Sequence, residues 1–189
     1  MNIVFEGLPG AGKTSIIKEL IKSKKLKNIK ILLEYLPEVT GDREDISFYI
    51  SNEKKKSDYF SKNKDSILLC DRYWQSSAIY CGATSNGLDI NDLKTLYFML
   101  HREHLEDNYI YVYLKVSTEV SLRRAQTPDV SNMWATPSFS ERCSKLYELV
   151  FDNIENIDKN VRKKIMIDTS SNSLSTTVAI IENLIVGNE

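Results

Sequence analysis

Short apolar runs alternate along the chain with longer segments in which apolar residues recur at helical spacing. The runs at 3–5, 31–33, 66–71, 109–116 and 164–168 are rich in β-branched, aromatic and leucine residues and predict buried strands. The segments between them predict helices, and the first helix carries Ile16, Ile17, Leu20 and Ile21 on its apolar face. Because strands alternate with helices throughout, we predict an α/β fold in three layers. Its five-stranded sheet is expected to be mainly parallel, with helices on both faces.

Polar residues mark the starts of several predicted helices. Asp89 is placed to cap a helix over 90–100, and Ser117 begins a short helix that leads to Arg123 and Arg124. Ser138 has capping-box spacing to Glu141 and predicts the start of a long helix. The residues from 126 to 138 include prolines and small polar side chains, and predict a mobile connection.

The segment Gly7–Thr14 joins the first predicted strand to the first predicted helix and fits the phosphate-loop pattern G-x-x-x-x-G-K-[ST]. Backbone N–H groups of such a loop turn inward around a phosphate, beside the positive end of the helix. Lys13 would neutralise β- and γ-phosphate oxygens, and the Thr14 hydroxyl would hold Mg²⁺. The residues expected around the phosphates are Gly7, Pro9, Gly10, Ala11, Gly12, Lys13, Thr14 and Ser15. The strand–loop–helix context disfavours a glycine-rich turn that binds nothing.

Length and composition narrow the class of protein. A chain of 189 residues predicts a single domain with a sizeable core. The net charge of −1 gives no basic field for nucleic-acid binding, and no apolar run approaches the ~18 residues of a membrane span. We therefore expect a cytoplasmic protein with reduced thiols. His101 and His104 have no third ligand that would complete a metal site and are interpreted as an ordinary exposed pair.

Asp71 ends the third predicted strand and is followed by Arg72. A carboxylate at a strand end can hold Mg²⁺, usually through water, and the planar guanidinium suits a phosphate or a carboxylate. In parallel sheets ligands bind beyond the carboxyl ends of the strands. The phosphate loop and the segments 34–38, 71–72, 117–124 and 168–171 all follow strands, so we expect them to converge on one cleft.

The motifs together resemble the thymidylate kinase family, within the wider group of nucleoside monophosphate and deoxynucleoside kinases. The resemblance is carried by residues 5–15 and 71–82 and extends to Arg123, Arg124 and the end of the last strand. It implies a single P-loop kinase domain over 1–189, with Arg123 and Arg124 in a lid over about 123–138. It also implies transfer of the ATP γ-phosphoryl group with Mg²⁺, and a homodimer. The residues that the resemblance places near the acceptor are Arg72, Tyr73, Ser76, Ser77 and Tyr80.

The acceptor half of the site departs from this family. Pro9 stands where thymidylate kinases usually carry an acidic residue, and the arginine expected in the second helix to hold the acceptor phosphate has no clear match. Lys54 or Lys55 are candidates to replace that arginine, with a solvated lysine run as the alternative. Deoxynucleoside kinases use a glutamate after the second strand as a general base. Glu34 or Glu38 could take that role, and each could equally be an exposed loop carboxylate.

The sequence leaves several functions open. The first is phosphorylation of dTMP or a related monophosphate, and the second is phosphorylation of a nucleoside hydroxyl with Glu34 or Glu38 as base. A nucleotide-binding protein without catalysis, and a kinase for a small non-nucleotide acceptor, are further alternatives. A GTP-dependent switch is disfavoured because the guanine-reading motif is absent from the sequence.

Overall fold

A computed structural model describes residues 1–41, 46–84, 89–101, 108–125 and 136–187. Within these residues a five-stranded sheet is formed by β1 (Asn2–Glu6), β2 (Ile29–Leu32), β3 (Ile67–Asp71), β4 (Tyr109–Lys115) and β5 (Val161–Asp168). The strand order is β2-β3-β1-β4-β5, and all neighbouring strands pair in parallel. The predicted α/β fold is confirmed. With β1 at the centre, the loop that follows it lies at the middle of the carboxyl edge.

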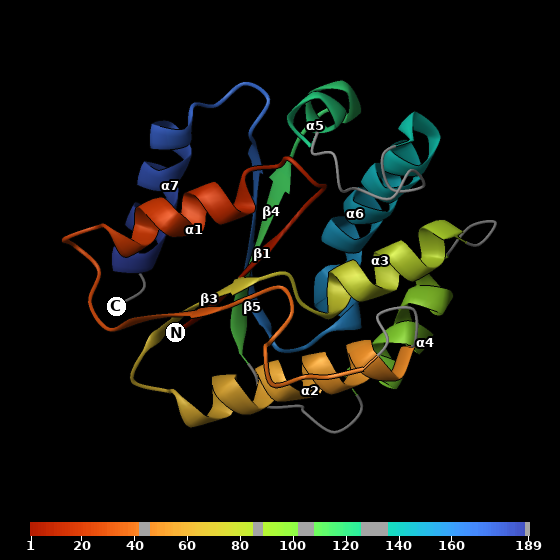
Figure 1. The fold of residues 1–189 in the computed structure, drawn as a ribbon, viewed down its shortest axis with the longest axis horizontal. Coiled ribbons are helices and arrows are strands. Elements are labelled where there is room, and N and C mark those ends of the chain that lie inside the picture. The colour runs from red at the N-terminus through yellow and green to blue at the C-terminus, as the bar shows by residue number, and fades with distance from the viewer. Residues whose placement is uncertain (42–45, 85–88, 102–107, 126–135, 188–189) are drawn as a thin grey trace.

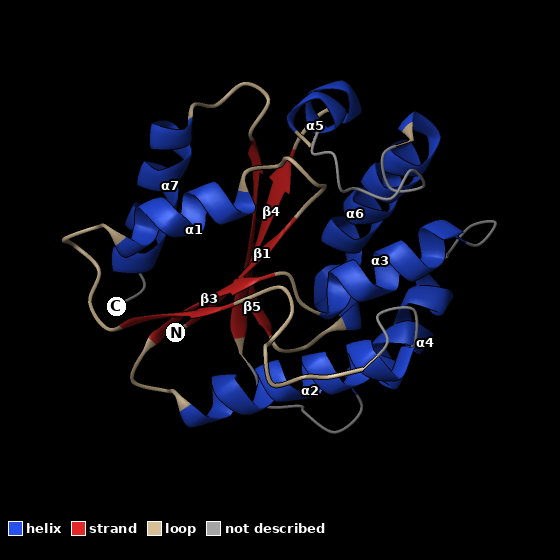
Figure 2. Ribbon diagram, in the orientation of Figure 1, coloured by secondary structure: helices blue, strands red, loops and turns tan. Residues whose placement is uncertain are grey.

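Helices cover both faces of this sheet (Figures 1 and 2). On one face lie α1 (Lys13–Ile21) and α7 (Leu174–Val186). On the other lie α2 (Ile46–Lys62), α3 (Trp74–Thr84), α4 (Ile90–His101) and α6 (Pro137–Ile157). The short helix α5 (Thr118–Arg124) lies beyond the end of β4. None of the helices within the described residues is long and apolar enough to cross a membrane.

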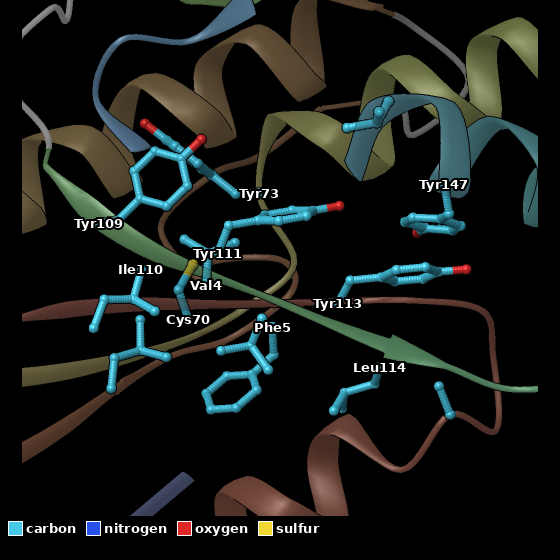
Figure 3. Packing of buried hydrophobic residues seen from close by; sticks show 14 of the residues in the cluster. Val4, Phe5, Cys70, Tyr73, Tyr109, Ile110, Tyr111, Tyr113, Leu114 and Tyr147 are labelled. Carbon is cyan, nitrogen blue, oxygen red and sulfur yellow. The ribbon is translucent and has the colours of Figure 1, made fainter. Parts of the chain in front are cut away.

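The side chains of β4 show how the core is divided between the two faces (Figure 3). Tyr109, Tyr111 and Tyr113 point to the face that α3 and α6 cover, whereas Ile110 and Leu114 point to the opposite face. The Tyr113 ring stacks on Tyr147 of α6, with 5.6 Å between ring centroids. Since both faces of β4 are buried, its sequence is almost continuously apolar and aromatic. The strand therefore carries buried side chains along almost its whole length up to the start of α5.

Some predicted boundaries were wrong. The two edge strands start earlier than predicted, β2 at Ile29 and β5 at Val161, because their outer positions are exposed and polar and hide the apolar signal. Helix α6 starts at Pro137, and the side chain of Thr136, not Ser138, caps it by accepting the Phe139 N–H. The signal for the true start was Pro137, because proline is common at the first helical position, where its missing N–H needs no partner.

Parts of the predicted lid and connection lie outside the described residues. These are 126–135, which make up most of the lid predicted over 123–138, and His104 of the histidine pair.

Candidate active site

The phosphate loop packs so tightly against its neighbours that a Cβ added at either of two glycines, Gly7 or Gly10, would clash. Gly7 has φ +144° and Gly10 has φ +72°, backbone angles that residues with a Cβ rarely adopt. A Cβ on Gly7 would lie 2.4 Å from the Leu114 carbonyl oxygen, and one on Gly10 would lie 2.8 Å from that of Ser121. The loop is thus pressed against the end of β4 and against α5.

Lys13 lies buried inside the curve of this loop. Its Nζ donates hydrogen bonds to the carbonyl oxygens of Gly7 at 2.9 Å and Leu8 at 3.1 Å. Burial and the neighbouring positive charge of Arg72 lower the pKa of Lys13 to about 8, against the opposing effect of nearby carboxylates. The nearby carboxylates thus do not fully compensate for the burial of this ammonium group, and a bound phosphate would add the missing negative charge.

Thr14 and Asp71 lie in contact at the carboxyl edge of the sheet and form a candidate pair of magnesium ligands. The Thr14 hydroxyl donates to Asp71 Oδ2 at 3.0 Å. The other carboxylate oxygen, Asp71 Oδ1, is buried and has no hydrogen-bond partner among the described residues. A buried carboxylate oxygen without a donor is costly unless a cation or water binds it. Hydroxyl and carboxylate oxygens are hard ligands, so these residues fit Mg²⁺.

Helix α5 is bonded directly to the phosphate loop. The Ser121 hydroxyl donates to the Pro9 carbonyl oxygen at 2.7 Å. The Arg124 guanidinium donates to the carbonyl oxygens of Gly10 at 3.4 Å and Thr169 at 3.0 Å, and so joins the loop to the turn after β5. Arg123 is exposed on the same helix. Both predicted lid arginines therefore lie at the phosphate end of the sheet, and Arg124 contacts the loop itself.

Arg72 occupies the centre of the acceptor side. Its Nε lies 3.2 Å from Glu34 Oε1, and its Nη1 donates to the Ser76 hydroxyl at 2.8 Å and the Tyr147 hydroxyl at 2.9 Å. The guanidinium lies over the Tyr80 ring, 5.1 Å from its centroid. Burial opposes the charge, but the surrounding acidic and phenolic groups raise the pKa of Arg72 well above its usual value.

The backbone of Arg72 is left-handed, with φ +64°. This conformation costs a residue with a Cβ about 1–2 kcal/mol and persists only where the surroundings enforce it. The Arg72 carbonyl oxygen accepts a hydrogen bond from Lys56 Nζ at 2.7 Å and one from the Cys70 thiol at 3.0 Å. A hydrogen bond from a charged donor is worth about 1.5–3 kcal/mol, enough to offset the strain.

Glu6 is a structural support of the site that sequence reasoning missed. Its buried carboxylate accepts hydrogen bonds from the backbone N–H groups of Tyr73 at 2.8 Å and Ser76 at 3.2 Å, and from the Ser76 hydroxyl. Burial raises the pKa of Glu6, against the opposing charge of Arg72. Glu6 therefore fastens the start of α3 to the end of β1. The signal was a carboxylate at the end of an apolar strand, directly before the phosphate loop.

The second feature that was missed is a buried polar face on α2. Asn52, Glu53 and Lys56 are each at most 2% exposed, and they share a helix face with buried Phe60. Lys54 and Lys55, the candidates for binding the acceptor phosphate, are exposed on the outer side of α2. The interpretation of residues 54–56 as a uniformly solvated run is wrong for Lys56. The helical spacing of 52, 53, 56 and 60 was the available signal.

The structure separates the two candidate glutamates. Glu34 lies at Arg72, whereas Glu38 is exposed and its carboxylate accepts a hydrogen bond from the Tyr59 hydroxyl at 2.8 Å. Of the predicted acceptor residues, Tyr73 packs into the core between Phe60 and Tyr109 and does not reach the site surface.

The remaining predicted acceptor residues lie on α3, and two of them, Ser76 and Tyr80, contact the guanidinium of Arg72. Ser76 is buried beneath the guanidinium, Ser77 is partly exposed, and Tyr80 is partly exposed with its ring against Arg72.

Comparison with known proteins agrees with this geometry. A thymidylate kinase of Ureaplasma parvum is 29% identical over 97% of this chain and 88% of its own length. Among solved structures, deoxyadenosine kinase from M. mycoides with bound dATP superposes with a TM-score of 0.69 at 20% identity, covering 98% of this chain and all of that one. Thymidylate kinase from Candida albicans gives 0.70 at 16% identity over 99% and 91%. No family model matches the sequence.

The phosphate loop, the Asp71-Arg72 strand end and the parallel sheet of this chain therefore occur together in a sequence related along almost its whole length to a thymidylate kinase. The sequence likeness and the shared fold support a thymidylate kinase-like P-loop kinase, that is, a nucleotide or nucleoside kinase.

Proposed function

We propose that this enzyme transfers the γ-phosphoryl group of ATP to the hydroxyl of a deoxynucleoside. The observation that carries the proposal is the pairing of Glu34 with Arg72, 3.2 Å apart, on the acceptor side of the cleft. Glu34 is partly exposed, so a ligand can reach it, while Arg72 behind it is almost fully buried. A reachable carboxylate in an ion pair with a buried guanidinium is a suitable general base for a hydroxyl.

On the donor side, the residues of the phosphate loop bind and orient the triphosphate. Its N–H groups and the N-terminus of α1 face the phosphates, and Lys13 moves from the loop carbonyls to the β- and γ-phosphate oxygens. Thr14 and Asp71 would hold Mg²⁺, which neutralises charge on the phosphates when it is bound. Arg124 is close enough to the loop to stabilise the transferred group.

On the acceptor side, Glu34 takes the proton of the substrate hydroxyl as that oxygen forms a bond to the γ-phosphorus. The bond between this phosphorus and the β–γ bridging oxygen breaks, and ADP leaves with the bonding electron pair. Arg72 keeps Glu34 oriented and adds positive charge where negative charge spreads over the phosphoryl oxygens. Positioning and charge thus supply the catalysis, as phosphoryl transfer requires.

A monophosphate such as dTMP is the second candidate acceptor, and the thymidylate kinase relative supports it. Its phosphate is already ionised and needs no base. Glu34 would instead repel a dianionic acceptor unless Arg72 compensated for it. The geometry therefore favours the nucleoside. The proposed homodimer and cytoplasmic location rest on the resemblance and composition alone.

A panel assay tests the proposal. The protein is incubated with Mg²⁺, ATP labelled at the γ-phosphate, and each of the four deoxynucleosides or dTMP, and products are separated by chromatography. Labelled deoxynucleoside monophosphate is the expected product. Label in dTDP alone would assign the monophosphate reaction, and ATP binding without any labelled product would identify a nucleotide-binding protein without catalysis.

A further inference from the structure

We propose that Lys56, together with Asn52 one turn earlier on α2, is a positioning residue that sets how Arg72 and Glu34 face each other. The proposal deepens the proposed function, since it concerns the pair assigned there to the acceptor. Neither side chain reaches the surface of the protein, because Lys56 is 0% and Asn52 is 1% exposed. Their effect on the reaction would therefore pass through Arg72 and Glu34.

Lys56 acts on the Arg72 half of the pair. Its Nζ donates to the Arg72 carbonyl oxygen at 2.7 Å, from the helix that lies across from the end of β3. The left-handed backbone of Arg72 turns this carbonyl toward α2 and the guanidinium toward Glu34, Ser76 and Tyr147. Because the ammonium group of Lys56 fixes the carbonyl of Arg72, the backbone of Arg72 keeps one conformation, and this conformation sets the direction of its side chain.

Asn52 acts on the Glu34 half of the pair. Its Oδ1 accepts the Leu36 N–H at 3.0 Å, and its Nδ2 donates to the Glu34 carbonyl oxygen at 3.0 Å. The side-chain amide therefore bonds to the backbone on both sides of Tyr35 and fixes the loop after β2. One helical turn of α2 thus holds the backbone of the base and the backbone of its guanidinium partner at the same time.

A purely structural role for Lys56 would be as the counter-ion of Glu53. That ion pair is long, with 4.0 Å between Lys56 Nζ and Glu53 Oε1, whereas the bond to Arg72 is short. Burying an ammonium group carries a large desolvation free energy, and an apolar residue could fill this position in the core without that penalty. A lysine at position 56 is explained by its hydrogen bond to the carbonyl oxygen of Arg72, which stabilises the left-handed backbone of that residue.

The first test is steady-state kinetics of Lys56→Met, which keeps the length of the side chain and removes the donor. We expect kcat with the acceptor to fall about 10²-fold while KM for ATP stays within about twofold, as for misplacement of a reacting group. Lys56→Arg should recover part of the lost rate, because it restores a cationic donor. Lys62→Met, on an exposed turn of the same helix, should behave as the unmodified protein.

A double-mutant cycle separates positioning from general destabilisation. If Lys56 acts through the Glu34–Arg72 pair, Lys56→Met should cost much less in a Glu34→Gln background than in the unmodified protein. Equal losses in both backgrounds would overturn the proposal. If Lys56→Met does not fold, the neutral variant Glu53→Gln/Lys56→Met removes the ion pair as a whole and is measured in its place.

A crystal structure of the same variant provides a readout that does not depend on activity. We expect Arg72 to lose its positive φ and its guanidinium to move away from Glu34. Retention of φ near +64° with the ion pair intact would refute the positioning role even for a protein that phosphorylates nothing. Absence of product from the unmodified enzyme would instead refute the proposed function, so the two failures are distinguishable.

Discussion

Lys13 is the single residue on which donor binding depends most. It is buried in the phosphate loop, and its ammonium group donates hydrogen bonds to the carbonyl oxygens of Gly7 and Leu8. Lys13→Ala should lower ATP turnover by about 10²–10³-fold, the usual effect of losing one preorganised donor to the transferring group. ADP release would be measured beside Lys18→Ala, an exposed lysine of the same helix, and equal rates for the two variants would contradict this role.

Gly10 is constrained both by its backbone and by its neighbours. Gly10→Ala would force a Cβ to within 2.9 Å of the Arg124 Cβ and 2.8 Å of the Ser121 carbonyl oxygen, at φ +72°. Since α5 cannot stay where it is, we expect at least a tenfold weaker Kd for ATP and a loss of about 1–2 kcal/mol in the free energy of unfolding. Calorimetric titration and urea unfolding measure these quantities, and unchanged values of both would show that α5 is not pressed against the loop.

Among the helices and strands, α2 shows most clearly which features could not be predicted from the sequence. The helix was predicted from its apolar residues, but its buried polar face was not, because Asn52, Glu53 and Lys56 look like surface residues in a hydrophilic segment. Their partners come from the loop after β2 and from the left-handed Arg72, which no local pattern reveals. By contrast the phosphate loop was recognisable from sequence, because its glycines and lysine meet a local requirement.

The buried carboxyl of Glu53, on α2, makes the unfolding free energy of the protein depend on pH. Burial raises the pKa of Glu53 to about 7, although the charge of Lys56 opposes the shift. The folded state thus holds this proton more tightly than the unfolded chain, so the stabilising contribution is complete below the unfolded pKa of ~4.3 and is lost as the pH rises toward 7. The loss is on the order of 3 kcal/mol.

Glu53→Gln should remove this dependence, because glutamine does not titrate. Urea unfolding between pH 5 and pH 7.5 should therefore show a steeper decline of the unfolding free energy for the unmodified protein than for the variant. Glu141→Gln, an exposed glutamate of α6, is the matched control and should follow the unmodified curve. Parallel curves for Glu53→Gln and the unmodified protein would show that the carboxyl is not held protonated.

For the whole molecule, the fold could be predicted because the alternation of strands and helices is a property of the entire chain. The bounds of the buried strands β1, β3 and β4 were predicted closely, while those of the edge strands β2 and β5 were predicted less well, since exposed polar positions interrupt their apolar pattern. Sequence reasoning also placed the site at the carboxyl edge. It did not identify Glu6 and Lys56, because each supports the site through groups that are distant in sequence.

At the opposite edge of the sheet, Asp158 joins elements from four parts of the chain. Its buried carboxylate accepts hydrogen bonds from Tyr109 at 2.6 Å, Trp74 at 3.1 Å, Tyr97 at 3.2 Å and the Asn160 N–H at 2.9 Å. Asp158→Asn replaces one acceptor by a donor and should cost about 2–4 kcal/mol of unfolding free energy.

ATP affinity of the folded Asp158→Asn protein should not change, since the site lies at the other edge. Urea unfolding and titration with ATP measure the two effects separately. Asp152→Asn, an exposed position on α6, is the control. A large loss of ATP affinity without a loss of stability would mean that the two edges of the sheet are coupled.

The most direct measurement of the central claim compares Glu34→Gln and Glu38→Gln on both candidate acceptors. If Glu34 is the base held by Arg72, Glu34→Gln should lower kcat for the deoxynucleoside by about 10²–10⁴-fold, while Glu38→Gln, whose carboxylate is bonded to Tyr59, should change it less than threefold. An unaffected or faster reaction of Glu34→Gln with dTMP would agree with the same assignment. Equal and small effects of both substitutions on the deoxynucleoside reaction would contradict it.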